Sequence, residues 1–447
     1  MPLPDLIEIV PLTAPVRAEI TVPGSKSITN RALILAALAD GEVTLKGALW
    51  SEDTQIMVEC LTELGFVVNV AQDPDELCNR TIMVVGQGGL IPSGGTESKP
   101  LELFVGNAGT AARFLAPFLC LGSGVYRLHG VKRMHERPQA ALMVALRELG
   151  YRVESENGND KLPVKIFGSG PKNGRCRVSI EESSQFASAL LLSAIVGRWE
   201  IETIGENEDE SPYVGMTREI VKQFSNAKSE YWIEPDASSS SYLKGAGWLF
   251  PKVEGLNLRF PSVTVPEPKW TTQIDRNFSV FFDAPGTIRH LGDNSKYKVV
   301  ISRSTNLGDS IMTAIVLAPF SNQAVQFTEL GRLRVQECER VVALRTELTK
   351  CGAKVVEEGD ALTVYPANLE ELNGSEIETY NDHRMAMCFS ILGLKVPGIK
   401  IKNPACVKKT FPNFFQKLAA QPPHGLGAEI LDAKSGRKLT HEELFAD

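Results

Sequence analysis

Cations recur in this sequence where a polar loop opens an apolar segment. In GSKSITNRALILAAL, Lys26, Ser27 and Arg31 fall at the start of a run of small and apolar residues that predicts a buried helix over 28–38. The first turn of a helix carries free N–H groups and the positive end of the helix dipole, so it already favours an anion. Two cations added there suit a phosphate or carboxylate ligand, although a Ser-capped helix with solvated cations would read the same way.

Polar residues, in most cases with cations, precede other apolar helices along the chain. They are Asn107, Gly109, Thr110 and Arg113; Lys132, Arg133, His135 and Arg137; Ser183, Ser184 and Gln185; and Asp382, His383 and Arg384. Further charged residues are Glu337 and Arg340, and Lys408 and Lys409. Hydroxyls and an amide suit a phosphate or a sugar-like ring without adding charge. A solvated basic loop is the alternative for 132–137. Together the cations outnumber the carboxylates beside them, which indicates a site for several anionic groups.

Two carboxylates in the second half of the chain could move protons. Asp309 lies at the mouth of the apolar segment NLGDSIMTAIVLA, where it is either a helix cap or a general base. Glu337 and Arg340 are three residues apart in RVQECERV, so they share a helix face. A surface ion pair is the alternative reading of that pair.

Length, charge and cysteine spacing indicate which class of protein this is. At 447 residues the chain suggests two or three domains, and a net charge of −7 argues against nucleic acid as a partner. The start of the chain has no basic leader or apolar signal core, and no stretch approaches 18 uninterrupted apolar residues, so we expect a soluble cytoplasmic protein without a membrane partner. The eight cysteines are scattered without CxxC or Cys/His spacing, so we expect reduced thiols and no metal site.

The elements that would position these residues recur. In LTELGFVV, LRELGYRV and LTKCGAKVV, the glycines Gly65, Gly150 and Gly352 sit where a helix needs a left-handed C-cap, and a strand pattern follows. Polar openings of apolar helices occur at 24–38, 106–119, 182–195, 236–243, 306–318 and 380–393. Three precede residue 235 and three follow it, which predicts two domains of three units each, although generic βα punctuation would look similar. The unit from 236 to about 300 matches worst and cannot be read in detail.

The motifs GSKSITNRA, GNAGTAARF, RMHERP, ESSQFASALLLSA, NDHRMAMCFSILG and CVKKTFPNFF together resemble the 5-enolpyruvylshikimate-3-phosphate synthase family, in its order and spacing, from about residue 7 to 420. The resemblance implies an α/β fold, a two-domain inside-out α/β barrel of the enolpyruvyl transferase type with three βαβαββ units in each domain. It implies an N-terminal domain over 22–234 on the shikimate 3-phosphate side. Residues 1–21 plus 235–447 would form the C-terminal domain on the phosphoenolpyruvate side. Within it, 421–447 would be an extra tail, which we expect to add a surface turn with a short helix capped by Thr440.

The resemblance also implies the reaction. The enolpyruvyl group of phosphoenolpyruvate would pass to the 5-hydroxyl of shikimate 3-phosphate, with release of phosphate, by addition and elimination through a tetrahedral intermediate. This is a step of the shikimate pathway to chorismate and the aromatic amino acids, and the family is the target of glyphosate. Domain closure would exclude water. The resemblance implies no metal or organic cofactor, and we expect a monomer.

Site residues follow from the resemblance position by position. The catalytic residues would be Asp309 as the base, and Glu337 with Lys26 as the proton donor and later acceptor. The shikimate 3-phosphate contacts would be Lys26, Ser27, Arg31, Ser183, Ser184, Gln185, Ser211, Tyr213, Asp309 and Gln336. The phosphoenolpyruvate contacts would be Lys26, Asn107, Gly109, Arg133, Gln185, Arg340, Arg384 and Lys409.

Three positions on the shikimate side depart from the family pattern. The family usually has lysine at Gln336, asparagine in one large branch at Arg332, and serine at Glu210, next to which this chain has Ser211. A neutral Gln336 loses a charge-assisted hydrogen bond worth about 1.5 to 3 kcal/mol, which Arg332 could restore from one turn earlier.

These departures keep rival functions open. A transferase acting on a different cyclic alcohol would account for them, but Arg31 and the SSQ triplet suit a 3-phosphate. The UDP-N-acetylglucosamine enolpyruvyl transferase shares the fold, but it uses a cysteine in the loop that corresponds to 133–138, and this loop has none. A non-catalytic anion-binding relative would have no reason to keep both Asp309 and Glu337.

Overall fold

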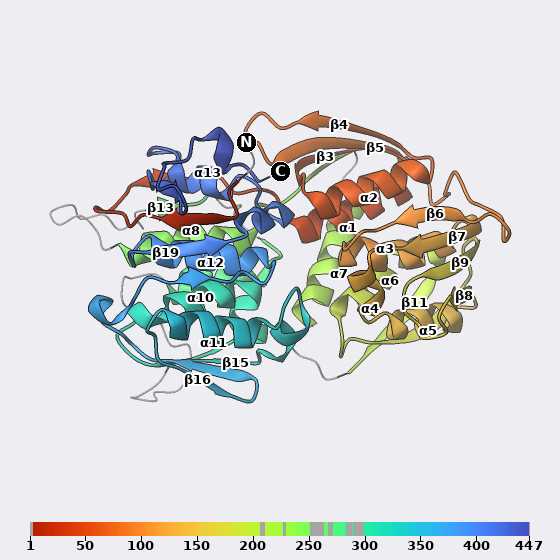
Figure 1. Cartoon of the computed structure of the whole chain (residues 1–447). Coiled ribbons are helices and arrows are strands. Elements are labelled where there is room, and N and C mark those ends of the chain that lie inside the picture. Colours follow the sequence, from red (N-terminus) through yellow and green to blue (C-terminus); the bar gives the residue numbers. More distant parts are fainter. Residues whose placement is uncertain are drawn as a thin grey trace. The chain divides into compact units, whose positions relative to one another are not determined.

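The chain divides into two compact units. The computed structural model describes residues 3–205, 211–226, 229–250, 263–266, 271–282, 288 and 299–446, with the backbone alone for Ser211 and Asn226 (Figure 1). The N-terminal unit comprises Gly24–Glu234, and the C-terminal unit comprises Met1–Pro23 with Pro235–Asp447. Each unit has its own hydrophobic core. Most of the segment 251–298, which the sequence left unread, lies outside the described residues.

The N-terminal unit surrounds buried helices with short strands. Its helices are α1 (Lys26–Leu38), α2 (Glu52–Glu63), α3 (Gly109–Cys120), α4 (Lys132–Glu136), α5 (Ala140–Glu148), α6 (Ser184–Gly197) and α7 (Ser211–Asn226). Its strands are β3 (Asp40–Leu49), β4 (Val67–Gln72), β5 (Asn79–Gln87), β6 (Leu101–Phe104), β7 (Ser123–His129), β8 (Arg152–Ser155), β9 (Val164–Ser169), β10 (Gly174–Ser179), β11 (Trp199–Ile204) and β12 (Glu230–Trp232).

Three of these helices form the centre of the unit. The helices α1, α3 and α6 pack against one another. Every residue of α3 is buried, and so is every residue of α1 after Ser27. A helix that is apolar on nearly every face must be covered all round, so the prediction of a buried helix over 28–38 is confirmed. Figure 1 shows β3 and β5 running beside α1 and α2.

The C-terminal unit has a comparable set of elements. Its helices are α8 (Ala237–Leu249), α9 (Phe278–Phe281), α10 (Ile311–Leu317), α11 (Arg340–Lys350), α12 (His383–Gly393) and α13 (Phe414–Ala419). Its strands are β1 (Leu6–Ile9), β2 (Ala18–Glu19), β13 (Val263–Thr264), β14 (Val299–Ser302), β15 (Val325–Thr328), β16 (Val355–Glu358), β17 (Ala361–Val364), β18 (Glu376–Ile377), β19 (Ile399–Lys402) and β20 (Ile430–Asp432). Short 3-10 or π turns are η1 (Ile274–Asn277), η2 (Arg303–Leu307), η3 (Gly308–Ser310), η4 (Ala318–Phe320), η5 (Gly331–Val335), η6 (Leu369–Glu371), η7 (Pro404–Lys409) and η8 (Glu442–Leu444). The helices α8, α10 and α12 pack together as its centre (Figure 1).

The sheets share one pairing pattern. Within the described residues, four sheets have the orders β12-β3-β5-β4, β6-β7-β9-β8, β14-β15-β17-β16 and β18-β19-β1-β20. In each of the four, the first pair is parallel and the next two pairs are antiparallel. The two-stranded sheets β10-β11 and β13-β2 are parallel. The molecule is therefore an α/β protein with mixed sheets.

The helix ends follow the glycine signals in the sequence. Gly65, Gly150 and Gly352 have φ values of 89°, 82° and 88°, and they follow the last turns of α2, α5 and α11. Only glycine adopts this left-handed conformation without steric cost, so each of these helices ends there and the chain turns into a strand. The predicted C-caps are confirmed.

The tail is more than the surface turn expected from the sequence. Its strand β20 pairs antiparallel with β1, and Leu439 and Leu444 are buried against the core of the C-terminal unit. The short helix is confirmed as η8, but its N-cap is His441 and not Thr440. Thr440 Oγ1, one residue earlier, accepts from Glu443 N at 3.4 Å. The tail therefore belongs to the fold of this unit.

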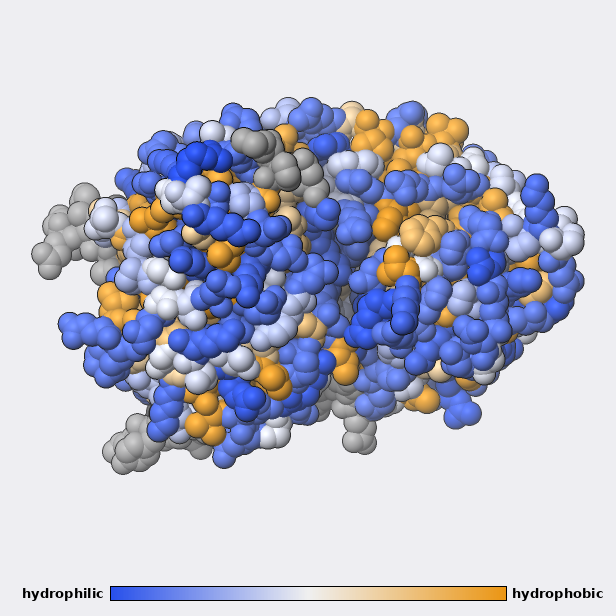
Figure 2. Space-filling model, in the orientation of Figure 1, coloured by the Kyte–Doolittle hydropathy of each residue, from blue (hydrophilic) through white to orange (hydrophobic). Residues whose placement is uncertain are grey.

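The surface drawn in Figure 2 is mainly hydrophilic, with hydrophobic residues in small patches. None of the helices in the described part of the chain is both long and apolar enough to span a membrane.

Candidate active site

The central helices of the N-terminal unit begin close together. Arg113, in the second turn of α3, donates from Nη1 to Gln185 Oε1 at the start of α6, at 2.6 Å. Arg31, in the second turn of α1, donates from Nη2 to Ser188 Oγ of α6, at 3.2 Å. The positive ends of three helix dipoles therefore lie in one region, which favours an anion.

Lys26 already has a carboxylate partner in this unit. Its Nζ lies 2.9 Å from Asp53 Oδ2 of α2, and the two side chains are 16% and 6% exposed. Asp53 had not been singled out in the sequence, because nothing in EDTQIMVEC distinguishes it from an ordinary acidic residue in the first turn of a helix. The neighbouring Ser27 is partly exposed at the same helix start.

Arg31 is held by hydroxyls and a carbonyl. Its Nε donates to Thr217 Oγ1 at 2.8 Å, and its Nη1 donates to the carbonyl of Ser27 at 2.8 Å. The guanidinium also lies over the ring of Phe114, 5.1 Å from its centroid. Burial lowers the pKa of Arg31 to about 10, which still leaves the group charged at neutral pH. Within the described part of the chain, no ion pair is formed by this buried cation, so an anionic ligand would compensate it well.

The start of α6 carries the polar triplet of the sequence. Ser183 is the N-cap and accepts from Gln185 N at 3.3 Å, while Ser184 is the first helical residue, and both serines are buried. The amide of Gln185 is fixed between Arg113 and Thr110, to whose Oγ1 it donates at 3.5 Å. Arg113, one of the cations noted in the sequence, thus orients a predicted ligand contact.

The loop before α3 contacts Arg137. Asn107 is exposed and Gly109 is buried. A Cβ on Gly109 would lie 2.6 Å from Arg137 Nη1, and Arg137 also donates to the carbonyl of Asn107 at 3.3 Å. A side chain at position 109 would therefore displace Arg137.

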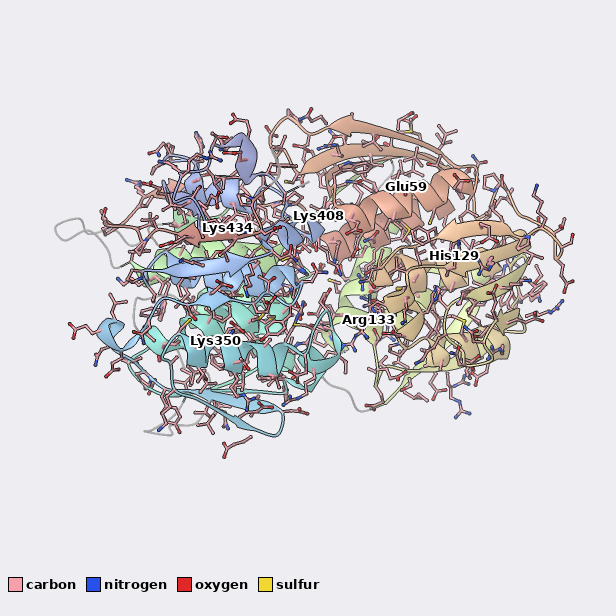
Figure 3. All side chains as sticks on the ribbon, in the orientation of Figure 1. Glu59, His129, Arg133, Lys350, Lys408 and Lys434 are labelled. Carbon is pink, nitrogen blue, oxygen red and sulfur yellow. The ribbon has the colours of Figure 1, made fainter. Side chains whose placement is uncertain are left out.

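The remaining predictions in this unit have different outcomes. Arg133, labelled in Figure 3, is 59% exposed on α4 and pairs with Glu136 at 2.9 Å, so its contacts in the structure are those of a surface residue. Tyr213 lies on α7, and its carbonyl accepts from Thr217, the hydroxyl that holds Arg31. The side chain of Ser211 and all of Glu210 lie outside the described residues.

In the C-terminal unit, Asp309 lies between two arginines. Its Oδ1 is 3.0 Å from Arg303 Nη2 and its Oδ2 is 3.2 Å from Arg384 Nη2. Burial acts to raise the pKa of Asp309, but the neighbouring cations, chiefly Arg384 and Arg303, outweigh burial and hold the pKa well below its ordinary value. The carboxylate is therefore ionised throughout the physiological pH range.

Hydroxyl groups of α8 also contact Arg384. This arginine lies in the first turn of α12 and donates to Ser238 Oγ at 3.2 Å and to Tyr242 Oη at 3.3 Å. Asp236, the N-cap of α8, accepts from the hydroxyl of Ser238 at 2.9 Å. The starts of α8 and α12 and the turn before α10 thus meet, as the helix starts of the N-terminal unit do.

A second cluster surrounds Arg340. This guanidinium donates from Nε to Asp382 Oδ2 at 2.7 Å and from Nη2 to Asp382 Oδ1 at 3.2 Å. Its Nη2 also donates to Glu337 Oε2 at 2.8 Å, and its Nη1 donates to Gln336 Oε1. The other oxygen of Glu337 lies 3.2 Å from Lys409 Nζ. The structure thus brings together Gln336, Glu337, Arg340 and Lys409, four of the residues singled out in the sequence.

Asp275, like Asp53, is a buried carboxyl group with no signal in the sequence. Asp275, in η1, accepts from Ser310 N at 2.7 Å, and its Oδ2 is 2.9 Å from where a Cβ on Gly308 would lie. It therefore supports the turn that presents Asp309. Burial and the charge of Asp309 raise the pKa of Asp275 to about 7. It lies in TTQIDRNF, where no periodicity or motif signals a function.

A metal site is not indicated by the described residues, in which no three His, Cys, Asp or Glu side chains are arranged to hold an ion.

Comparison with known proteins decides the family. A family model described as EPSP synthase (3-phosphoshikimate 1-carboxyvinyltransferase) matches residues 11–418. The chain belongs to this family. A 3-phosphoshikimate 1-carboxyvinyltransferase of Opitutus terrae is 37% identical over 446 residues, covering 94% of this chain and 98% of that protein. One from Trichormus variabilis is 35% identical over 437 residues, covering 92% of this chain and 98% of that protein.

Solved structures agree with this EPSP synthase membership at the level of the fold. An EPSP synthase from Acinetobacter baumannii has a TM-score of 0.72 at 18% identity, covering 95% of this chain and 99% of that chain. The enolpyruvyl transferase NikO from Streptomyces tendae has a TM-score of 0.66 at 14% identity, covering 98% of this chain and 100% of that chain. The resemblance read from the motifs is confirmed, and the chain is a transferase of the EPSP synthase family.

Proposed function

We propose that this chain transfers the enolpyruvyl group of phosphoenolpyruvate to the 5-hydroxyl of shikimate 3-phosphate and releases phosphate, as a step of the shikimate pathway. Family membership supports the reaction. The observation that carries it is the pair of carboxylates in the C-terminal unit. Asp309 and Glu337 are each bound to arginines yet remain 18% and 21% exposed. Two such carboxylates suit proton transfer beside an anionic substrate.

Asp309 is the proposed partner of the acceptor hydroxyl. In the addition step, the 5-oxygen forms a bond to C2 of phosphoenolpyruvate and Asp309 accepts the hydroxyl proton, which it returns to the phosphate group that leaves in the elimination step. Because Arg303 and Arg384 keep Asp309 ionised, it can accept this hydrogen bond at any physiological pH. The same arginines make it a weak base, so its main contribution is to orient the hydroxyl.

Glu337 is the proposed proton donor to C3 of phosphoenolpyruvate, with help from Lys26. The product of the addition is a tetrahedral ketal phosphate. In the elimination step C3 loses a proton to the same group, the bond from C2 to the phosphate oxygen breaks, and the C2–C3 double bond returns. Lys409, 3.2 Å from Glu337, adds a cation where the phosphate must be stabilised as it leaves.

Residues of both units are proposed to bind the two anions. For shikimate 3-phosphate they are Lys26, Ser27, Arg31, Ser183, Ser184, Gln185, Ser211, Tyr213 and Asp309. For phosphoenolpyruvate they are Lys26, Asn107, Gly109, Arg133, Gln185, Arg340, Arg384 and Lys409. The helix starts and buried cations described above support these assignments.

The repeated sheets support a finer description of the fold. We propose that each unit consists of three βαβαββ repeats arranged as an inside-out α/β barrel. Each unit has, within its described residues, two four-stranded sheets and one parallel pair of strands. The shared order of parallel and antiparallel pairing is what three copies of one supersecondary unit would produce.

Phosphate release tests the proposed reaction. With both substrates present, we expect the native protein to release phosphate, and we expect Asp309→Asn and Glu337→Gln each to slow the release by about 100-fold or more, the usual contribution of acid–base groups. Glu358→Gln, at an exposed glutamate of β16, is the matched control and should release phosphate normally. Native protein that releases phosphate only with another cyclic alcohol would overturn the proposed acceptor. Undiminished release by both variants would overturn the assigned roles.

A further inference from the structure

Gln336 touches Arg340 in this structure. The guanidinium of Arg340 is 1% exposed, so each of its N–H groups needs a partner within the protein or on a ligand. Asp382, itself wholly buried, takes the Nε side and one Nη2 contact. Glu337 and Gln336 take the outer contacts of Nη2 and Nη1.

Residue chemistry fixes which end of the Gln336 amide faces Arg340. A guanidinium carries only donors, so the amide oxygen must be the atom that accepts from Nη1. The amide Nε2 then points away with its two N–H donors. Gln336 is partly exposed, and within the described part of the chain no protein acceptor is recorded for Nε2.

A lysine at this position could not make this contact. A lysine ammonium has three donors and no acceptor, and it would place a like charge four residues from Arg340. Glutamine, whose amide oxygen accepts, can therefore hold Arg340 where lysine could not. Asp382 is itself held by the backbone N–H of Arg384, which donates to Asp382 Oδ1 at 2.9 Å. Asp382 therefore anchors one side of the Arg340 guanidinium, and Gln336 contacts the other side.

We propose that Gln336 is a positioning residue for Arg340, and that in this chain position 336 serves the binding of phosphoenolpyruvate rather than of the cyclic acceptor. Gln336 and Asp382 hold the guanidinium from opposite sides. The plane of Arg340 is thereby set before the carboxylate or phosphate of the ligand arrives, which lowers the entropic cost of binding. The inference rests on the proposed function for the identity of the ligand.

The test compares Gln336→Met, which removes the acceptor at similar size, with Gln336→Lys. Gln326→Met, at a partly exposed glutamine of β15, is the matched control. For both variants at 336 we expect the KM for phosphoenolpyruvate to rise about tenfold, the factor that corresponds to one charge-assisted hydrogen bond. The KM for shikimate 3-phosphate should change by less than about twofold, and the control should match the native protein.

The melting temperature of the substrate-free protein is the second readout. Leaving a buried guanidinium N–H without its acceptor should lower Tm by about 2 to 4 °C in both variants and not in the control. A fall in Tm with an unchanged KM for phosphoenolpyruvate would mean a purely structural contact and would overturn the proposal. An unchanged Tm would also overturn the proposal. A lower KM of Gln336→Lys for shikimate 3-phosphate would then indicate that position 336 contacts that substrate.

The two hypotheses can fail separately. Phosphate release by the native protein tests the proposed function in the same assay, and the split between the two KM values tests the role of Gln336. If the native protein released no phosphate, the Tm comparison would still decide whether Gln336 holds Arg340.

Discussion

At the scale of single residues, Asp275 and Asp309 lie on either side of one turn. Asp275 holds the backbone N–H of Ser310, and Asp309 points to Arg303 and Arg384. Their environments push the two pKa values apart: burial raises that of Asp275 to about 7, whereas the arginines keep that of Asp309 low. Asp309 thus carries the negative charge of the site. Asp275 supports the turn that presents Asp309 and has a pKa near neutrality.

This difference predicts a pH-dependent effect of Asp275→Asn. In the unfolded chain an aspartate titrates near pH 4, so between about pH 4 and 7 the folded protein holds a proton that the unfolded chain has lost. The contribution of Asp275 to the free energy of unfolding therefore falls as the pH rises through that window. Asparagine keeps the acceptor for Ser310 and removes the titration.

Denaturant unfolding measures the effect. The free energy of unfolding of Asp275→Asn, minus that of the native protein, should increase by on the order of 1 to 4 kcal/mol between pH 4.5 and pH 8. A difference between variant and native protein that stays constant across this range would contradict the assignment of a raised pKa to Asp275.

At the scale of elements, the tail is an integral part of the C-terminal unit. Gln416 of α13 donates to the carbonyl of His441 at 2.8 Å, and Ala446 donates to the carbonyl of Pro412 at 3.0 Å. Leu444, the last residue of η8, is 2% exposed and packs in the core of the unit. The tail strand β20 also pairs with β1, whose edge would otherwise offer unpaired backbone groups.

Truncation of one tail side chain tests this. Leu444→Ala should lower the free energy of unfolding by about 2 to 5 kcal/mol, because it leaves a cavity in a packed site. Lys434→Ala, at an exposed lysine of the same tail that Figure 3 labels, should change it by less than about 0.5 kcal/mol. Equal stabilities of the two variants would show that the tail does not pack as described.

Sequence patterns predicted the elements whose signals are local. The glycines at 65, 150 and 352 fixed helix ends because a left-handed C-cap is a property of one residue. The polar residues at the six openings stand at or beside helix starts for a similar reason. Asp275 and Asp53 could not be predicted, because their roles come from contacts made across the fold. The pairing of β20 with β1 joins residues more than 400 positions apart, and no local pattern encodes it.

At the scale of the whole molecule, an acidic chain concentrates its cations locally. The net charge is −7, yet Arg31, Arg113, Arg303 and Arg340 are all almost completely buried. Burying a cation is costly, so these arginines are kept where carboxylates, hydroxyls or an anionic ligand compensate them. Arg31 and Arg113 lie in the second turns of α1 and α3, Arg303 lies in η2 before α10, and Arg340 begins α11.

The measurement that tests the account most directly is deuterium incorporation during turnover in D2O. Addition and elimination give C3 of phosphoenolpyruvate a solvent-derived proton before one of the three methyl hydrogens is lost. The account therefore predicts deuterium in the vinyl methylene of the product, seen by NMR. A product formed at the full rate without deuterium at that carbon would contradict proton transfer to C3 and with it the role proposed for Glu337.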